Sequence, residues 1–175
     1  MKTNVALIGF MGVGKTVVGN LVAQRLDKQF VETDSLIVQK AGKSIAKIFK
    51  EDGEIAFRDT EIEVIKELAP EEGLVIDCGG GIVLNKINID RLKQKAIVVW
   101  LTASPNTILK RTAADRDERP LLSQNKGIAG IQSMIHLRKP FYEQAADIKV
   151  DTSRLSTESV ASKIIERLAE FEDFY

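Results

Sequence analysis

Short apolar runs alternate along the chain with longer segments whose apolar residues recur every three or four positions. Continuous apolar runs are typical of strands buried on both faces of a parallel sheet, and the longer spacing is typical of amphipathic helices. We expect strands over residues 4–8, 29–33, 74–77, 96–102 and 147–151. We expect helices over 15–26, 35–50 with a break at Gly42, 52–68, 84–92, 105–112, 128–145 with a break or kink at Pro140, and 157–171.

This alternation of strands and helices predicts βαβ units with right-handed crossovers. The fold class is therefore α/β, a three-layer domain around a parallel sheet of about five strands, and we expect one domain over residues 1–175. In such sheets ligands bind beyond the carboxyl ends of the strands. The segments with unusual chemistry all lie at those ends, or in the helices and the loop that follow.

Charge and composition narrow the classes of function. Lys plus Arg and Asp plus Glu both number 25, so the chain has no basic surplus for general binding to nucleic acid or anionic membranes. No apolar run approaches the roughly 18 residues of a membrane helix, and we expect no signal peptide. Cys78 is the single cysteine, which excludes an internal disulfide and favours the cytosol.

The strongest chemical signal follows the first strand. Residues 9–16 read Gly-Phe-Met-Gly-Val-Gly-Lys-Thr and match the phosphate-binding pattern G-x-x-x-x-G-K-[ST], between a predicted strand and a predicted helix. Glycines let backbone N–H groups face the phosphates, Lys15 adds a positive charge, and the Thr16 hydroxyl can bind Mg²⁺. We expect ATP contacts from the backbone and side chains of Gly12, Val13, Gly14, Lys15, Thr16 and Val17.

Acidic residues end the second and third strands. Glu32 and Asp34 are two residues apart at the end of a predicted strand, so we expect them to point the same way, toward metal, substrate hydroxyls or a proton. The alternative is that Asp34 or Ser35 caps the next helix. Asp77 ends the third strand, where an acid commonly supports Mg²⁺. Gly79, Gly80 and Gly81 follow it and either bring backbone close to a ligand or form a plain turn.

Arginines near these segments are candidates for binding anions. A kinase needs a mobile cation over the γ-phosphate, and Arg116 or Arg119 can supply it from a charged loop at about 113–130. A substrate carboxylate needs a forked cation, and Arg58 and Arg138 are the candidates for it. Each arginine could instead be a solvated surface charge. His136 and Trp100 are interpreted as a helix-surface residue and a core residue, and Cys78 as a buried apolar one.

The ordered combination of these segments resembles the shikimate kinase family of P-loop kinases. The resemblance runs nearly from end to end through the phosphate loop, Glu32-Thr33-Asp34, Gly53-Glu54-x-x-Phe57-Arg58, the three glycines, Arg119-Pro120-Leu121-Leu122, Arg138-x-Pro140-x-Tyr142 and Val150-Asp151-Thr152. It implies phosphoryl transfer from ATP to the 3-hydroxyl of shikimate, in the route to chorismate and the aromatic amino acids. It also implies the P-loop NTPase fold with sheet order 2-3-1-4-5, a lid at about 113–125, a substrate-binding region at about 34–61, a cytoplasmic monomer and Mg²⁺ as cofactor.

The same resemblance implies a role for each matching residue. Asp34 would bind ring hydroxyls and act as the base, and Lys15 and Arg119 would stabilise the transferring group. Arg58 and Arg138 would hold the shikimate carboxylate, Glu61 would orient Arg58, and Arg111 would stack on adenine. The glycines Gly79, Gly80 and Gly81 would line the acceptor pocket, and Thr16, Glu32 and Asp77 would serve Mg²⁺.

The chain departs from the family pattern at three places. Glu32 stands where Asp is usual, Asp77 stands where a hydroxyl residue is common, and residues 153–157 lack a proline that often lies against adenine. Other readings are a gluconate or nucleotide kinase, a non-catalytic ATP-binding module and a regulatory GTPase. The last would use residues 77–80 as D-x-x-G and residues 85–88 as an imperfect N-K-x-D.

Overall fold

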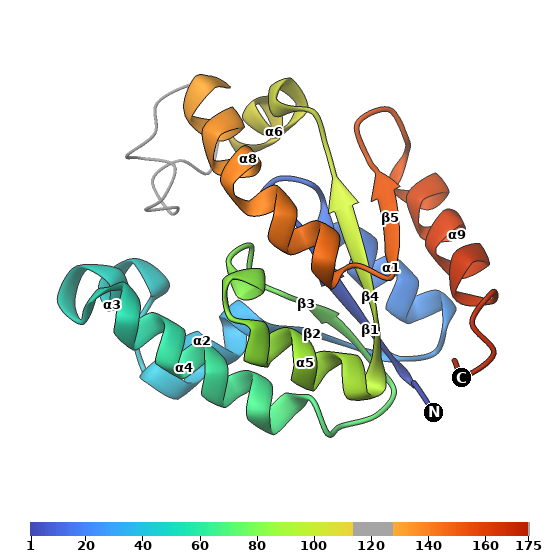
Figure 1. Ribbon diagram of the computed structural model, residues 1–175, viewed down its shortest axis with the longest axis horizontal. Helices are drawn as coiled ribbons and strands as arrows, with labels where there is room; N and C mark the ends of the chain where they lie inside the picture. Colours follow the sequence, from blue (N-terminus) through green and yellow to red (C-terminus); the bar gives the residue numbers. More distant parts are fainter. Residues whose placement is uncertain (114–127, 175) are drawn as a thin grey trace.

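Five parallel strands form the sheet at the centre of the protein (Figure 1). This computed structural model describes residues 1–113 and 128–174. The strands are β1 (Asn4–Ile8), β2 (Gln29–Glu32), β3 (Leu74–Asp77), β4 (Ala96–Thr102) and β5 (Ile148–Asp151), in the order β2-β3-β1-β4-β5. The predicted fold class and strand order are therefore confirmed.

Helices cover both faces of the sheet (Figure 1). They are α1 (Lys15–Arg25), α2 (Thr33–Ala41), α3 (Ile45–Glu51), α4 (Gly53–Leu68), α5 (Lys86–Lys95), α6 (Pro105–Thr112), α8 (Ile128–Ala145) and α9 (Thr157–Leu168), with a short 3₁₀ turn η1 (Ile82–Leu84). No helix in the described ranges is both long and apolar enough to cross a membrane.

Alternate residues of the central strands enter two separate apolar cores. Val5 and Leu7 of β1 pack with residues of α1 and α9, whereas Ala6 and Ile8 pack with residues of α4, α5 and the end of α8. The central strands β1, β3 and β4 are apolar at nearly every position because both of their faces are covered, whereas the edge strand β5 alternates buried and exposed residues. Trp100 is 5% exposed and Cys78 is fully buried, as predicted for core residues. A third, smaller core joins α2, α3 and α4 through Ile37, Ile48, Phe57 and Val64.

Several predicted boundaries were wrong by a few residues. The helix expected at 35–50 is two helices, as Gly42 suggested, but α2 begins at Thr33, and Gly42 ends it with a left-handed φ of 68°. In place of the helix expected at 84–92, the structure has η1 followed by α5. Helix α4 begins at Gly53, one residue after the predicted start. The final helix ends at Leu168 instead of 171, and β5 begins at Ile148. On α4, Val64 is buried, whereas Ile62, which was predicted to face the core, is only half-buried.

A break or a kink was predicted at Pro140, and helix α8 runs through this residue without a break. Proline removes one helix hydrogen bond, and the cost is smaller where the freed carbonyl can reach water. Pro140 and His136 are both exposed. Contacts of α8 with the turn after β3, described below, hold the helix on both sides of the proline. The helix begins at Ile128, as predicted, so residues 128–130 do not belong to the charged loop proposed for about 113–130.

Candidate active site

The phosphate loop joins β1 to α1 at the carboxyl edge of the sheet. Gly12 has a φ of 78°, and a Cβ there would lie 2.7 Å from Thr112 Cγ2, so only glycine fits. Gly14 precedes α1 in a left-handed conformation with φ 98°. Lys15 folds back over the loop, and its Nζ donates to the carbonyl oxygens of Gly9 (3.2 Å) and Phe10 (3.4 Å). The sequence thus forms a cradle whose backbone N–H groups and helix N-terminus suit phosphate.

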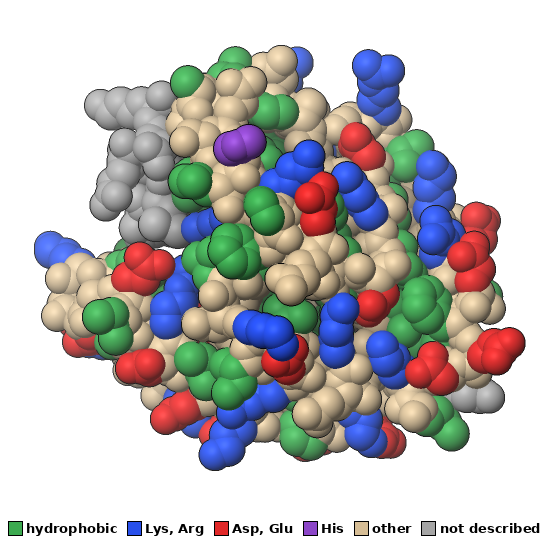
Figure 2. Space-filling model, viewed as in Figure 1, with side chains coloured by type: hydrophobic (Ala, Val, Ile, Leu, Met, Phe, Trp, Pro, Cys, Tyr) green, Lys and Arg blue, Asp and Glu red, His purple; other side chains and the backbone are tan. Residues whose placement is uncertain are grey.

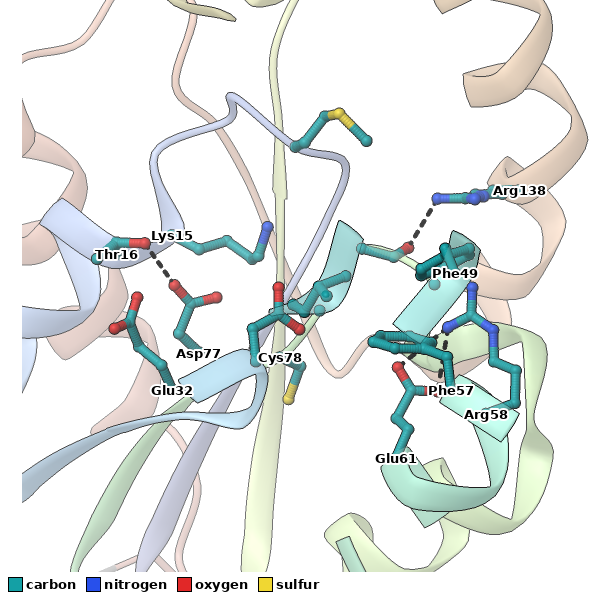
Figure 3. Close-up of a pocket in the computed structure, with 16 residues that line it drawn as sticks. Lys15, Thr16, Glu32, Phe49, Phe57, Arg58, Glu61, Asp77, Cys78 and Arg138 are labelled. Carbon is teal, nitrogen blue, oxygen red and sulfur yellow. Dashed lines mark hydrogen bonds and ion pairs between the residues drawn. The ribbon is translucent and has the colours of Figure 1, made fainter. Parts of the chain in front are cut away.

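Oxygen ligands meet beside this cradle. The Thr16 hydroxyl donates to Asp77 Oδ2 at 2.7 Å, and Glu32 lies opposite Asp77 in the register of β2 and β3. Figure 3 shows the three side chains gathered at one side of the cavity. One hydroxyl and two carboxylates fit Mg²⁺, which prefers oxygen ligands and usually keeps only one or two protein carboxylates beside nucleotide phosphates. No cluster of three acidic, His or Cys side chains occurs in the described residues, so nucleotide oxygens would complete such a site.

A cavity of about 290 Å³ lies between this edge and helices α2 to α4. Lys15, Thr16, Glu32 and Asp77 line this cavity. All the residues predicted to bind the acceptor line it too: Asp34, Arg58, Glu61, Gly79, Gly80, Gly81 and Arg138. The sequence did not assign the apolar part of its wall, which comes from Met11, Ile45, Phe49 and Phe57. The Phe49 and Phe57 rings pack with their centroids 4.8 Å apart. The cavity therefore combines charged groups with an apolar side, as suits a small polar ring.

Asp34 does not lie on the strand as expected. Strand β2 ends at Glu32, and Asp34 is exposed in the first turn of α2, so strand alternation does not relate the two acids. Neither Asp34 nor Ser35 is the N-cap, which is Glu32, and the Ser35 hydroxyl instead donates to Glu32 Oε2 (3.3 Å). Asp34 still reaches the cavity, because a Cβ on Gly79 would lie 2.8 Å from its Oδ1.

Arg58 reaches the cavity from α4 and is held by acids of the same helix. Its Nη1 donates to both carboxylate oxygens of Glu61, at 3.1 and 3.2 Å, and Figure 3 shows the pair. Burial raises the pKa of the Glu61 carboxyl, and the Arg58 guanidinium opposes that shift. Gly81 packs against the guanidinium so closely that a Cβ there would lie 2.6 Å from Nη1. The predicted orienting contact between Glu61 and Arg58 is thus present.

Arg138 reaches the cavity from α8. Its side chain is largely buried, and its Nη1 donates to the Gly80 carbonyl at 3.3 Å (Figure 3). The Tyr142 hydroxyl, one helical turn further along, donates to the same carbonyl. Tyr142 stacks on Trp100 with ring centroids 5.5 Å apart, and burial raises the pKa of Tyr142 to about 12. Sequence reasoning assigned no role to Tyr142, although its spacing from Arg138 places both on one face of the helix.

A second cavity, of about 430 Å³, opens on the other side of the phosphate loop and shares Lys15 and Thr16 with the first. It includes all the predicted ATP-binding residues of the described ranges: Gly12, Val13, Gly14, Lys15, Thr16, Val17 and Arg111. The Arg111 guanidinium donates to the Val13 carbonyl (3.2 Å) and to Thr152 Oγ1 (3.0 Å). Leu155 and Thr157 supply part of the wall where a proline is absent.

Comparisons with known proteins agree with this geometry. The family model described as shikimate kinase matches residues 11–169. A shikimate kinase of Symbiobacterium thermophilum is 40% identical over 168 residues, which cover 95% of this chain and 97% of the relative. One of Thermodesulfovibrio yellowstonii is 44% identical over 162 residues, covering 93% and 92%.

The chain belongs to the shikimate kinase family. A solved structure of shikimate kinase from Acinetobacter baumannii in complex with shikimate has a TM-score of 0.92 at 33% identity, covering 99% of this chain and 96% of that one. The structure of the Aquifex aeolicus shikimate kinase has a TM-score of 0.82 at 34% identity, with 95% and 96% covered. The predicted family, fold and phosphotransferase class are confirmed.

Family membership also excludes the alternative that the protein is a regulatory GTPase. The segment 85–88 begins helix α5 instead of ending a strand, and Asn88 is buried. His136 is exposed on α8, as expected. Arg116, Arg119 and all of the predicted lid except Ala113 lie outside the described residues. The roles of the individual site residues stay predictions.

Proposed function

We propose that this protein transfers the γ-phosphoryl group of ATP to the 3-hydroxyl of shikimate, giving shikimate 3-phosphate and ADP. One observation carries the proposal: Arg58 and Arg138, the three glycines and Asp34 line one cavity that opens beside Lys15. Two arginines suit a carboxylate, and an acid beside a phosphate cradle suits a hydroxyl that attacks phosphorus. Family membership supports the same reaction. Its place would be the route to chorismate and the aromatic amino acids.

The acceptor would be held at two ends. Arg58 and Arg138 would bind its carboxylate, with Gly79, Gly80 and Gly81 letting the backbone approach the ring. Asp34 would bind a ring hydroxyl and accept its proton as the oxygen–phosphorus bond forms and the bond to the ADP oxygen breaks. Such positioning of the attacking group accounts for much of the rate enhancement in phosphoryl transfer. Phe49 and Phe57 would shield the ring from water.

The nucleotide would occupy the second cavity, its phosphates at residues 12–17. Lys15, which lines both cavities, would stabilise charge on the transferring phosphoryl group, and Arg119 would do so from the lid. Arg111 would contact adenine. Thr16, Asp77 and Glu32 would hold Mg²⁺, directly or through water. Bound Mg²⁺ would neutralise phosphate charge in the ground state and the transition state.

A coupled assay of ADP release tests this proposal. The purified protein with Mg²⁺ and ATP is given shikimate, gluconate, a nucleoside monophosphate or no acceptor. We expect ADP release only with shikimate. Release with gluconate or the nucleotide would leave a P-loop kinase with another acceptor, and release without an acceptor would contradict a transferase. A cytoplasmic location and a monomeric state stay predictions.

A further inference from the structure

Two carboxylates hold the Arg58 guanidinium, and they differ in exposure. Glu61 contacts Nη1 and has a side chain only 1% exposed. Glu54, one turn earlier on α4, accepts from Nε at 3.4 Å and from Nη2 at 3.2 Å through its Oε1, and its side chain is 53% exposed. Arg58 therefore lies between an inner acid and an outer acid of its own helix.

The two acids also face different spaces. Arg58 lines both the acceptor cavity and an outer hollow of about 360 Å³ bounded by α4 and by Leu84 and Asn85, just before α5. Glu61 lines only the first of these spaces and Glu54 only the second. Glu54 is thus largely exposed in the outer hollow, whereas Glu61 is almost fully buried in the wall of the acceptor cavity.

A carboxylate binds arginine best through two parallel N–H groups. The guanidinium offers such pairs at Nε with Nη2 and at Nη1 with Nη2. Glu54 contacts the first pair and Glu61 contacts Nη1 of the second. An incoming carboxylate can therefore accept hydrogen bonds from two parallel N–H groups of Arg58 only if Glu54 or Glu61 moves away from the guanidinium. Glu61 is almost fully buried and directs both carboxylate oxygens at Nη1, whereas the Glu54 pair is exposed, and an exposed ion pair is weak and breaks easily.

We propose that Glu54 is a displaceable counter-ion of Arg58, which holds Nε and Nη2 from the side of the outer hollow and releases them when an acceptor carboxylate pairs with the guanidinium in the cavity. Glu61 stays and keeps the guanidinium in place. Glu54 is then a specificity-determining residue, because an anion enters only if it competes with a built-in carboxylate. This inference rests on the proposed role of Arg58 in binding the acceptor.

The test is calorimetric titration of shikimate into the whole protein and into two variants. Glu54→Gln keeps the side-chain size but removes the competing charge. Asp59→Asn removes the same charge from an exposed position next to Arg58, without an ion pair to the guanidinium among the described residues. We expect Glu54→Gln to bind shikimate about two- to fivefold more tightly, which matches the strength of an exposed ion pair, and Asp59→Asn to bind as the wild type does.

A neutral acceptor separates competition from other effects. Shikimate methyl ester lacks the free carboxylate, so its affinity should not rise in Glu54→Gln. Shikimate affinity that stays equal or falls in Glu54→Gln would overturn the inference and make Glu54 a positioning residue. Equal tightening in Asp59→Asn would attribute the effect to overall charge and overturn it too. A wild type that binds ATP but not shikimate would contradict the proposed function itself, and with it this inference.

Discussion

The Thr16 hydroxyl donates a hydrogen bond to Asp77 Oδ2 across 2.7 Å. The bond joins the first turn of α1 to the end of β3, two segments 61 residues apart in the chain. It fixes both oxygens at the boundary between the two cavities, since Thr16 lines both of them. The site expected for Mg²⁺ is therefore organised by the protein alone.

Replacing Thr16 should raise the Mg²⁺ requirement. Thr16→Ala removes one proposed ligand and leaves Asp77 without this donor, whereas Thr16→Ser keeps the hydroxyl. We expect the half-saturating free Mg²⁺ concentration to rise about 10- to 100-fold in Thr16→Ala and to stay near the wild-type value in Thr16→Ser. Initial rates measured against free Mg²⁺ at saturating shikimate check this. Identical curves for Thr16→Ala and the wild type would remove Thr16 from the metal site.

Arg138 should matter for the acceptor and not for ATP. Arg138→Ala removes a largely buried cation proposed to pair with the shikimate carboxylate, and losing such a partner typically costs about 2–5 kcal/mol. We expect shikimate affinity to fall at least about 30-fold while ATP affinity stays nearly constant, as measured by calorimetry. Lys139→Ala is the matched control, because it removes an exposed cation from the next position on α8. Equal losses for both ligands would contradict the assignment.

Tyr142 should position the turn at Gly79, Gly80 and Gly81 through its hydrogen bond to the Gly80 carbonyl. Tyr142→Phe keeps the stacking on Trp100 but removes the hydroxyl that donates to the Gly80 carbonyl. We expect KM for shikimate to rise several-fold, KM for ATP to stay unchanged, and the free energy of unfolding to fall by about 1 kcal/mol. Steady-state kinetics with each substrate varied, together with urea unfolding, measure this. A loss of stability with an unchanged KM for shikimate would leave Tyr142 a purely structural residue.

Gly81 should be needed because of Arg58. The backbone of Gly81 has φ −97°, which suits any residue, so the barrier to alanine there is the contact with the guanidinium. We expect Gly81→Ala to weaken shikimate binding at least about tenfold in the wild-type background, but by less than about twofold in Arg58→Ala. Binding measured for the four proteins of this double-mutant cycle gives the coupling. Equal effects in both backgrounds would show that the added methyl group acts on the acceptor directly.

Glu61 should make stability depend on pH. Burial raises its pKa in the folded protein, so its protonated form contributes stability that is present below the unfolded value of about 4.3 and lost as pH rises through the folded value. Glu61→Gln lacks this titration. The free energy of unfolding of the wild type should therefore fall relative to that of Glu61→Gln as pH rises from about 4 to 7. Urea unfolding across this range tests it, and a constant or opposite difference would contradict it.

The strands and the phosphate loop could be predicted because their signals are local. A buried parallel strand is apolar at every position, and the glycines, lysine and hydroxyl of the loop follow it at fixed spacing. The end of β2 could not be predicted in this way. From the sequence, Thr33 was predicted to extend the strand, but it begins α2 instead. Its hydroxyl accepts a hydrogen bond from the Gly79 N–H at 3.0 Å, a contact with a residue 46 positions away that the local sequence does not reveal.

Tertiary contacts also decided the features that the sequence did not reveal. Pro140 is tolerated inside α8, which Arg138 and Tyr142 anchor to Gly80. Phe49 comes from α3 and becomes part of the cavity wall only because that helix packs on α4. The contact of Glu54 with Arg58 is an i,i+4 pair visible in the sequence, but its importance depends on which side of Arg58 is enclosed.

The proposed reaction moves a phosphoryl group from ATP to shikimate. Phosphorus NMR of a reaction with Mg²⁺, ATP and shikimate observes that transfer directly. We expect the γ-phosphate signal to be replaced by equal amounts of ADP and a phosphate monoester on the 3-oxygen of shikimate, with no inorganic phosphate beyond that of an acceptor-free control. ADP accompanied by inorganic phosphate alone, or a γ-phosphate signal that persists, would contradict the claim.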